Sequence, residues 1–299
     1  MWFKNLRVYR LTGSLDLSAE ALSEQLSKNR FKPCAKMDFS RFGWVPPLGK
    51  LGVDLVHSVG HYRLITARRQ EKILPAAAIN ELLEDKVTVF EEREARKIYR
   101  KEKTRFKEDI LHSLLPTALT RSSFTNAYFD TKNQLLVVDT ASPGKADDFL
   151  DCLRAALGEL PVVPLSCHGD AADIMTRWVK RRTPKGFELD DECELKNSRD
   201  AKNIVRCKQQ DMGGEEIKQH LLAGKRVTQL ALSWRNAIRF LLSDDFVIKR
   251  VKFEDSVSET ENDTDDEAAR FDQDFSVMTI EVSQLLEDLL SEFGGAAKT

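Results

Sequence analysis

The sequence predicts an α+β protein in which a helical arm projects from a central domain and a second α+β domain forms a base. Strand-like and helix-like patterns alternate along most of the chain. The forty residues between Pro75 and Pro116 contain neither glycine nor proline, which indicates helix. Because strands and helices are predicted on both sides of this run, we interpret it as an insertion. A chain of 299 residues is long enough for two or three domains.

The central domain is predicted to comprise residues 1–75 and 117–169. Before the arm we expect a strand over 2–11, a short amphipathic helix over 18–28 and a strand near 61–67. After the arm, residues 124–130 and 134–140 have the pattern of a β-hairpin. Pro143 is predicted to open a helix that Gly158 closes, because proline fits the first turn and glycine the position after the last.

The base is predicted to comprise residues 170–299. We expect helices around 174–182 and over 215–223, and a C-terminal amphipathic helix that ends at Gly294. The expected strands cover residues 203–210, 226–234, 235–242 and 246–253. In the third of these strands, alternation places Arg235 and Arg239 on one face.

The arm, residues 76–116, has its charges sorted along the sequence. As one helix it would be about 60 Å long, and folded back on itself about 30 Å. If the helix is continuous, one face carries a stripe of cations, and these are Arg93, Arg96, Arg100, Lys103 and Lys107. Like charges four residues apart destabilise a helix by about 0.2–0.5 kcal/mol per pair. The stripe is therefore consistent with a nearby polyanion, although a solvated helix face is the commoner origin of such runs.

An acidic segment offsets the basic remainder of the chain. Residues 254–274 contain ten acids and one base, Arg270, so the segment carries a net charge of −9. Because the net charge of the whole chain is −2, the remainder carries +7. We expect a solvated acidic loop, with an intramolecular competitor for a basic surface as the alternative.

Several classes of site are disfavoured. Gly224-Lys225 is followed by Arg226, so the serine or threonine of a phosphate-binding loop is missing. The five cysteines are scattered without a C-x-x-C pair, and His57 and His61 lack the glutamate of a zinc helix. We therefore expect no metal and no cofactor. No apolar run approaches the roughly 20 residues that span a membrane, and the N-terminus lacks a signal-peptide core, so we expect a cytoplasmic protein.

A metal-dependent nuclease is the main enzymatic alternative. Glu194-Leu-Lys196 has the E-x-K form, in which a carboxylate holds Mg²⁺ and a lysine assists the attacking water. The upstream acids that would complete such a site are Asp173, Asp190 and Asp191. Residues 190–196 look more like the start of a helix, so we favour a protein without catalytic residues. Phe124, Tyr128 and Phe129 could stack on unpaired bases, but core or dimer packing is the favoured interpretation.

Several motifs in collinear order resemble the RdgC family of bacterial recombination-associated proteins. They are Trp2-Phe-Lys-Asn-Leu6, Phe31-Lys-Pro-Cys34, Gly43-Trp-Val-Pro-Pro47, Glu71-Lys-Ile-Leu-Pro75, Leu111-His-Ser-Leu-Leu-Pro116, Leu160-Pro-Val-Val-Pro-Leu165, Gln210-Asp211, Ala223-Gly-Lys225 and Leu230-Ala-Leu-Ser-Trp234. The resemblance covers essentially the whole chain. It implies a ring-shaped homodimer that encloses double-stranded DNA without sequence preference and restrains RecA-dependent recombination, in association with the nucleoid. Single-stranded DNA is a second candidate partner, and a regulator that binds RecA but not DNA remains an alternative.

The resemblance also implies particular site residues. Gln210 and Lys225 match DNA-facing positions of the family, whereas Gln209 stands where a lysine is expected, so Lys208 or Arg206 becomes the candidate there. Leu119 occupies a dimer-contact position where a phenylalanine is expected, and Phe124 is its neighbour in the predicted interface. The complete predicted DNA-binding set is Arg93, Arg96, Lys97, Arg100, Lys101 and Lys103 in the arm, and Lys208, Gln210, Lys225, Arg235 and Arg239 in the base.

Overall fold

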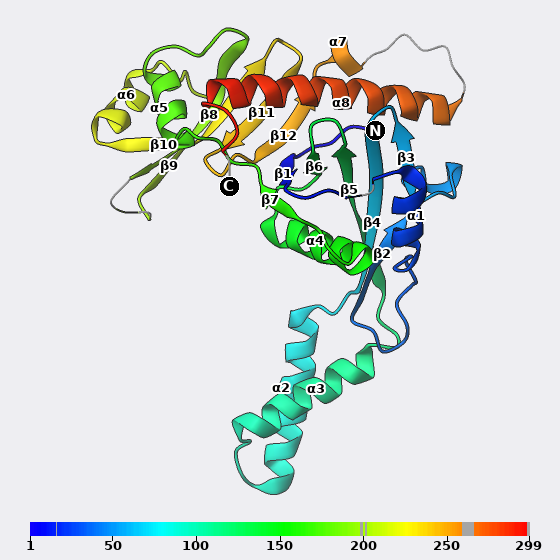
Figure 1. Cartoon of the computed structure of the whole chain (residues 1–299). Coiled ribbons are helices and arrows are strands. Elements are labelled where there is room, and N and C mark those ends of the chain that lie inside the picture. The colour runs from blue at the N-terminus through cyan, green and yellow to red at the C-terminus, as the bar shows by residue number, and fades with distance from the viewer. Residues whose placement is uncertain (16, 198–199, 201, 259–265, 298–299) are drawn as a thin grey trace. The chain divides into compact units, whose positions relative to one another are not determined.

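The computed structural model describes residues 1–15, 17–197, 200, 202–258 and 266–297. Within these residues the protein has eight α-helices and two sheets of seven and five strands, so the predicted α+β class is confirmed (Figure 1). The chain forms two compact units. One unit comprises Met1–Ser27, Pro46–Thr66 and Thr125–Thr299, and the other comprises Lys28–Val45 and Ala67–Phe124. No helix in the described ranges combines the length and the apolar character needed to cross a membrane.

The seven-stranded sheet has the order β2-β4-β5-β6-β1-β7, with β3 paired to β4. Its strands are β1 (Arg7–Leu11), β2 (Ser40–Val45), β3 (Val56–Val59), β4 (Tyr62–Lys72), β5 (Thr120–Asp130), β6 (Leu135–Val138) and β7 (Val162–Pro164). Strand β1 begins later than predicted because the N–H groups of Lys4 and Asn5 donate to Asp139 Oδ1, at 3.0 and 2.9 Å. The predicted hairpin of β5 and β6 is confirmed as an antiparallel pair.

Helices α1 (Ala19–Ser27) and α4 (Pro143–Leu157) are present where the sequence predicts them. In α4, Pro143 is the first residue, the Ser142 hydroxyl accepts the Lys145 N–H at 3.4 Å, and Gly158 follows with φ +85°. One side of α4 is buried by Ala146, Phe149, Leu150, Leu153 and Ala156. A short 3₁₀ turn, Gly49–Leu51, follows β2.

The five-stranded sheet has the order β12-β11-β10-β8-β9. Its strands are β8 (Phe187–Asn197), β9 (Ile204–Lys208), β10 (Lys225–Trp234), β11 (Ile238–Ser243) and β12 (Ile248–Phe253). The helices of this region are α5 (Ala171–Lys180), α6 (Glu215–Leu222), α7 (Asp255–Ser258) and α8 (Glu267–Glu292). The predicted helix start at residues 190–196 is wrong, because the segment lies in β8 and pairs with β9 and β10. Cys193 and Leu195 point to the core, at 1% and 0% exposure.

The β10–β11 connection also differs from the prediction. Arg235 and Asn236 have φ of 49° and 52°, which places both in a tight turn between two antiparallel strands. Strand β11 begins only at Ile238. The predicted strand alternation of Arg235 with Arg239 is therefore wrong, because only Arg239 lies in the strand.

Helix α8 is longer than expected and begins inside the acidic segment. Asp266 caps the helix by accepting the Ala268 N–H at 2.9 Å. Glu267 in the first turn stabilises the helix further, because a negative charge interacts favourably with the positive end of the helix dipole. Its buried face, which includes Phe275, Met278 and Val282, packs into the large core of its unit (Figure 1). The expected acidic loop is therefore wrong for 255–258 and 267–274, which are helical, while residues 259–265 lie outside the described residues.

Candidate nucleic-acid interface

The predicted arm is two helices, α2 (Ala76–Glu94) and α3 (Arg100–Leu114), that pack against each other (Figure 1). Their contact is made by the buried residues Ile79, Leu83 and Ile110. Helix α2 ends because Ala95 takes the left-handed conformation, with φ 51°. The expectation of one cationic stripe from Arg93 to Lys107 is therefore wrong, since these residues are divided between two helices and a turn.

The turn end of this hairpin is rich in exposed cations. Eight basic and two acidic residues lie between Arg93 and Lys107, and every one of the eight basic residues is exposed. They are Arg93, Arg96, Lys97, Arg100, Lys101, Lys103, Arg105 and Lys107. The structure thus brings together all six residues of the predicted arm set. Arg105 and Lys107 extend that set along α3.

Arg96 differs from Lys97, Arg100 and Lys101 because its guanidinium is already engaged. It donates to both carboxylate oxygens of Glu102, at 2.9 and 2.7 Å. Its Cζ also lies 4.9 Å from the ring centroid of Phe90 and 5.0 Å from that of Tyr99. Hydrogen bonds from Arg96 and from the Tyr99 N–H lower the pKa of Glu102 from 4.5 to about 2.

On the five-stranded sheet, Lys208, Gln210 and Lys225 have different surroundings. The Lys208 side chain is 63% exposed, and its Nζ lies 3.8 Å from Glu192 Oε1 on the neighbouring strand. Gln210 follows β9 and lines a pocket of about 480 Å³, where its amide donates to Glu216 Oε2 at 3.1 Å. Lys225 is only 9% exposed, and its Nζ donates to Asn203 Oδ1 at 2.8 Å.

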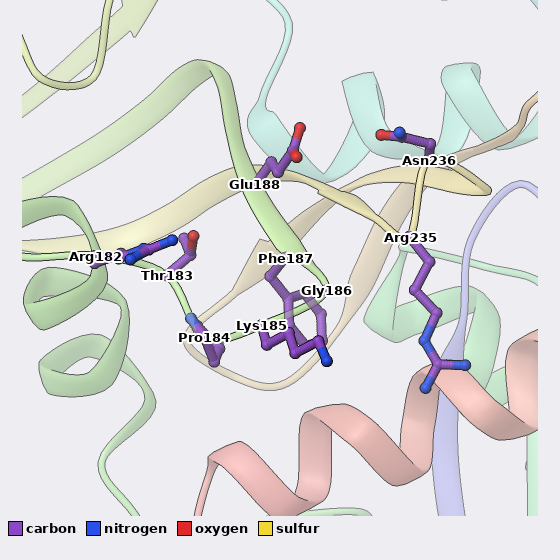
Figure 2. A pocket seen from close by; sticks show the side chains of 9 residues that line it. All are labelled: Arg182, Thr183, Pro184, Lys185, Gly186, Phe187, Glu188, Arg235 and Asn236. Carbon is purple, nitrogen blue, oxygen red and sulfur yellow. The ribbon is translucent and has the colours of Figure 1, made fainter.

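Arg235 lines a pocket of about 730 Å³ between the segment before β8 and the β10–β11 turn (Figure 2). Arg182 and Lys185 line the same pocket, and Glu188 is its one acidic side chain. The Arg235 side chain points towards α8, where it pairs with Asp288 at 2.8 Å (Figure 2). The pocket therefore has a basic lining, but one of its cations is neutralised from within the chain.

Arg239 and two further arginines are also paired. Arg239 Nε lies 2.7 Å from Glu254 Oε1, so the first residue of the acidic segment neutralises one predicted DNA contact. Arg206 pairs with Glu194 and Arg250 pairs with Glu192, at 2.8 and 2.9 Å. The sequence already offered Arg206 as an alternative to Lys208, whereas Arg250 was missed because it comes from a different strand. Four cations of this sheet, Arg206, Lys208, Arg239 and Arg250, are thus paired with carboxylates.

Comparison with known proteins shows the relationship of the whole chain. The family described as "Putative exonuclease, RdgC" matches residues 1–296. The chain belongs to the RdgC family. It is 45% identical over 298 residues to the Recombination-associated protein RdgC of Aeromonas hydrophila, covering 99% of this chain and 98% of that protein. The proteins of the same name from Tolumonas auensis and Yersinia pestis are 43% and 44% identical, over 99% and 100% of this chain and 99% of each relative.

The RdgC family description contains the word exonuclease, and the nuclease-like motif of this chain is the E-x-K sequence Glu194-Leu-Lys196. Glu194 and Lys196 lie two apart on β8, so they share a face as a nuclease motif requires. However, Glu194 Oε1 accepts the Thr228 hydroxyl at 2.9 Å, and Oε2 accepts Arg206 Nε at 2.8 Å. Burial disfavours the Glu194 carboxylate, but these two hydrogen bonds and the charges of Arg206 and Lys196 together outweigh it and hold its pKa below the usual range.

The other proposed metal ligands do not converge on Glu194. Asp173 lies 2.9 Å from Arg226 Nε, and Asp190 and Asp191 line the pocket beside Gln210. Within the described ranges, no group of three or more histidine, cysteine or carboxylate side chains has the arrangement of a metal site. The geometry of Glu194 is that of a structural ion pair.

The two predicted dimer-contact residues of this RdgC family member are exposed. Leu119 is 77% exposed and Phe124 is 58% exposed. Phe124 lies beside the Arg68 guanidinium, whose Cζ is 5.7 Å from its ring centroid. Tyr128 and Phe129 are 1% and 0% exposed, so they are core residues, as the favoured interpretation holds.

Proposed function

We propose that this protein binds double-stranded DNA without sequence preference, as a ring-shaped homodimer without catalytic activity, and restrains RecA-dependent recombination. Membership of the RdgC family supports a role in recombination, since its relatives are named recombination-associated proteins. A protein that occupies the duplex would obstruct a recombinase filament without any chemistry of its own. Single-stranded DNA is a secondary ligand, because the same cations would contact its phosphates.

The exposed cations of the α2–α3 turn carry the proposal. Affinity for duplex DNA comes mainly from lysines and arginines that displace counterions from phosphates. Contacts of this kind position the duplex but do not read its sequence. Eight exposed basic residues against two acids within Arg93–Lys107 provide such a surface. The paired cations Arg206, Lys208 and Arg250 form a second group, in which phosphates would compete with the carboxylates of Glu192 and Glu194.

Binding of unrelated duplexes at several salt concentrations tests the proposal. Replacing Lys97, Arg100 and Lys101 by glutamine should flatten the slope of log affinity against log salt by about 2.7, since each lost phosphate contact contributes about 0.9. Both duplexes should be affected equally. A matched control replaces three exposed lysines outside the hairpin, Lys50, Lys132 and Lys145.

The two triple variants have the same net charge, so only the position of the cations differs. An equal loss in the control would show that net charge alone is responsible, and the surface assignment would fail. A loss confined to one duplex sequence would contradict binding through phosphates.

Enclosure by a ring makes a separate prediction about loading. A closed ring should load slowly on a linear duplex whose two ends are blocked by bulky groups, and faster on the same duplex with free ends. Once loaded, it should be retained longer when the ends are blocked. Equal rates on the two duplexes would contradict enclosure and leave an open dimer.

The RecA antagonism is tested by strand exchange with the hairpin triple variant. If the protein acts by occupying duplex DNA, loss of DNA binding and loss of inhibition should occur together. Full inhibition by a variant that no longer binds DNA would instead favour direct contact with RecA.

A further inference from the structure

The turn between α2 and α3 takes a conformation that its backbone does not favour. It contains no glycine, yet Ala95 has φ 51°, where a Cβ atom is crowded by the following carbonyl oxygen. A residue with a side chain occupies this region only where surrounding contacts hold it there. The contacts that hold this turn are therefore the relevant feature of the hairpin.

Two carboxylates, one from each helix, bind the backbone of the turn. Glu91 of α2 accepts the N–H of Ile98 at 2.9 Å. Glu102 of α3 accepts the N–H of Tyr99 at 3.0 Å, which is half of a capping box at the start of that helix. Each of these hydrogen bonds fixes a residue between the two helices.

Arg96 joins these two ends of the turn. Its guanidinium forms a two-pronged ion pair with Glu102 and also donates to the carbonyl of Lys97 at 3.3 Å. Its Cζ lies over the rings of Phe90 in α2 and of Tyr99 at the start of α3. A planar guanidinium fits both a carboxylate fork and aromatic rings, which an ammonium group does not.

Three neighbouring cations lack such partners. In the described part of the chain, Lys97, Arg100 and Lys101 form no ion pair, and all three are exposed. A phosphate that approached Arg96 would first have to displace Glu102 and would then meet its carboxylate. Lys97, Arg100 and Lys101 present their charge without that cost.

We infer that Arg96 is a positioning residue that holds the α2–α3 turn, so that Lys97, Arg100 and Lys101 form a preorganised surface for the phosphates of a nucleic acid. The identity of the ligand rests on the proposed function. The positioning role rests on the contacts within the hairpin alone. Preorganisation increases affinity because the ordering of the binding loop is complete before the ligand arrives.

The positioning role of Arg96 and the effect of charge alone predict opposite changes in DNA affinity when Glu102 is replaced. Glu102→Ala removes a negative charge beside the surface and releases Arg96, so charge alone would tighten binding to a polyanion. If Glu102 and Arg96 hold the turn, the same substitution weakens binding by about fivefold or more, because the turn must then be ordered on binding. Glu108→Ala is the matched control, since it removes an exposed carboxylate from the same helix outside the turn.

The experiment has two measurements on the full-length protein. Affinity for a 30-base-pair duplex is measured by fluorescence anisotropy, and backbone amide exchange of residues 95–99 is measured without DNA. Glu102→Ala should lose exchange protection in the turn and bind more weakly, while Glu108→Ala should keep protection and bind as well as or better than the unchanged protein. Arg96→Lys keeps the charge but not the fork, and it should behave like Glu102→Ala.

The outcomes separate the inference from the proposed function. Tighter binding by Glu102→Ala with full protection of residues 95–99, or normal binding and protection in Arg96→Lys, would overturn the positioning role. If the unchanged protein binds no duplex at all, the proposed function fails. The exchange measurement still decides the positioning role in that case, because it requires no DNA.

Discussion

At the scale of single residues, the basic side chains of the hairpin look alike in sequence but differ in their surroundings. Arg96 is bound by Glu102 and flanked by two aromatic rings, whereas Lys97 is exposed without an ion pair among the described residues. The sequence predicts cations at these positions, since their number and order are explicit. It does not distinguish their roles, because Glu102 is six residues from Arg96 and reaches it only after the chain turns.

The Arg96–Glu102 pair predicts a pH dependence of the turn. The pKa of Glu102 in the folded protein is about 2, below its usual value of 4.5. The carboxylate therefore stabilises the turn fully above pH 4.5, and this contribution is lost as the pH falls towards 2. A carbon-13 NMR titration of Glu102 should show a midpoint near 2, and Arg96→Lys should raise that midpoint. A midpoint near 4.5 in the unchanged protein would contradict the ion pair.

Substitution of Lys208 should affect DNA binding, whereas substitution of Lys225 should affect stability. The exposed Lys208 should contribute to phosphate binding, so Lys208→Ala should flatten the salt slope by about 0.9 and leave the melting temperature unchanged. Lys225 is buried and bonded to Asn203, so Lys225→Ala should lower the free energy of unfolding by about 1–2 kcal/mol. Chemical denaturation of both variants checks this. Equal stability of the two variants would contradict the difference in burial.

At the scale of elements, the sequence succeeds where local signals define both ends. Helix α4 begins at Pro143 and is followed by Gly158, as predicted, because proline and glycine act through their own backbone preferences. Strand β8 was mistaken for a helix start because its acids, Asp190 to Glu194, also suit a first helical turn. What decides the structure there is pairing with β9 and β10, which come later in the chain.

The hairpin is another case in which contacts across the chain decide the element. Neither glycine nor proline marks its turn, so a single long helix and a folded one were equally compatible with the sequence. The apolar residues of α3 are sparse, and only Ile110 is buried among them. A small cluster of Ile79, Leu83 and Ile110 therefore holds the two helices together.

Ile110→Ala should release this contact. Removing a buried isoleucine costs about 2–5 kcal/mol, and Ile110 is one of only three buried residues in the cluster of the described hairpin. Amide exchange in both α2 and α3 should accelerate, while exchange in the five-stranded sheet should not change. Val89→Ala is the matched control, because Val89 is 65% exposed on α2 and its loss should have little effect. Equal acceleration in the two variants would show that the cluster does not hold the hairpin.

At the scale of the whole molecule, charge distribution was only partly predictable. The sequence places the acids between residues 254 and 274, but not their neighbours in the fold. In the structure Glu254 pairs with Arg239, and Asp274 pairs with the N-terminal amine at 2.7 Å. The acidic segment therefore neutralises groups from distant parts of the chain, and sequence spacing carries no information on such contacts.

The proposed absence of catalysis can be tested on the full-length protein. Because Glu194 is held by Arg206 and Thr228, incubation with Mg²⁺ and supercoiled plasmid should produce no nicks above a protein-free control. Glu194→Gln should instead lower the free energy of unfolding, since it removes the partner of Arg206. Nicking that requires Mg²⁺ and disappears in both Glu194→Gln and Lys196→Met would establish the nuclease alternative.

Leu119 provides the test of assembly. Backbone hydrogen bonds place Ile73 beside Leu119 and Phe39 beside Lys72, so Phe39, Ile73 and Leu119 are exposed apolar residues at the ends of neighbouring chain segments, at 51%, 44% and 77% exposure. If this surface joins two copies, Leu119→Asp should shift the protein towards monomer in sedimentation analysis. The melting temperature of each chain should change little, because the side chain is not part of its core.

Val53→Asp is the control for this substitution, since Val53 is 76% exposed outside this surface. A dimer that survives Leu119→Asp, or that is lost equally in Val53→Asp, would contradict the assignment, because burying a carboxylate in an apolar interface is costly only where that interface exists.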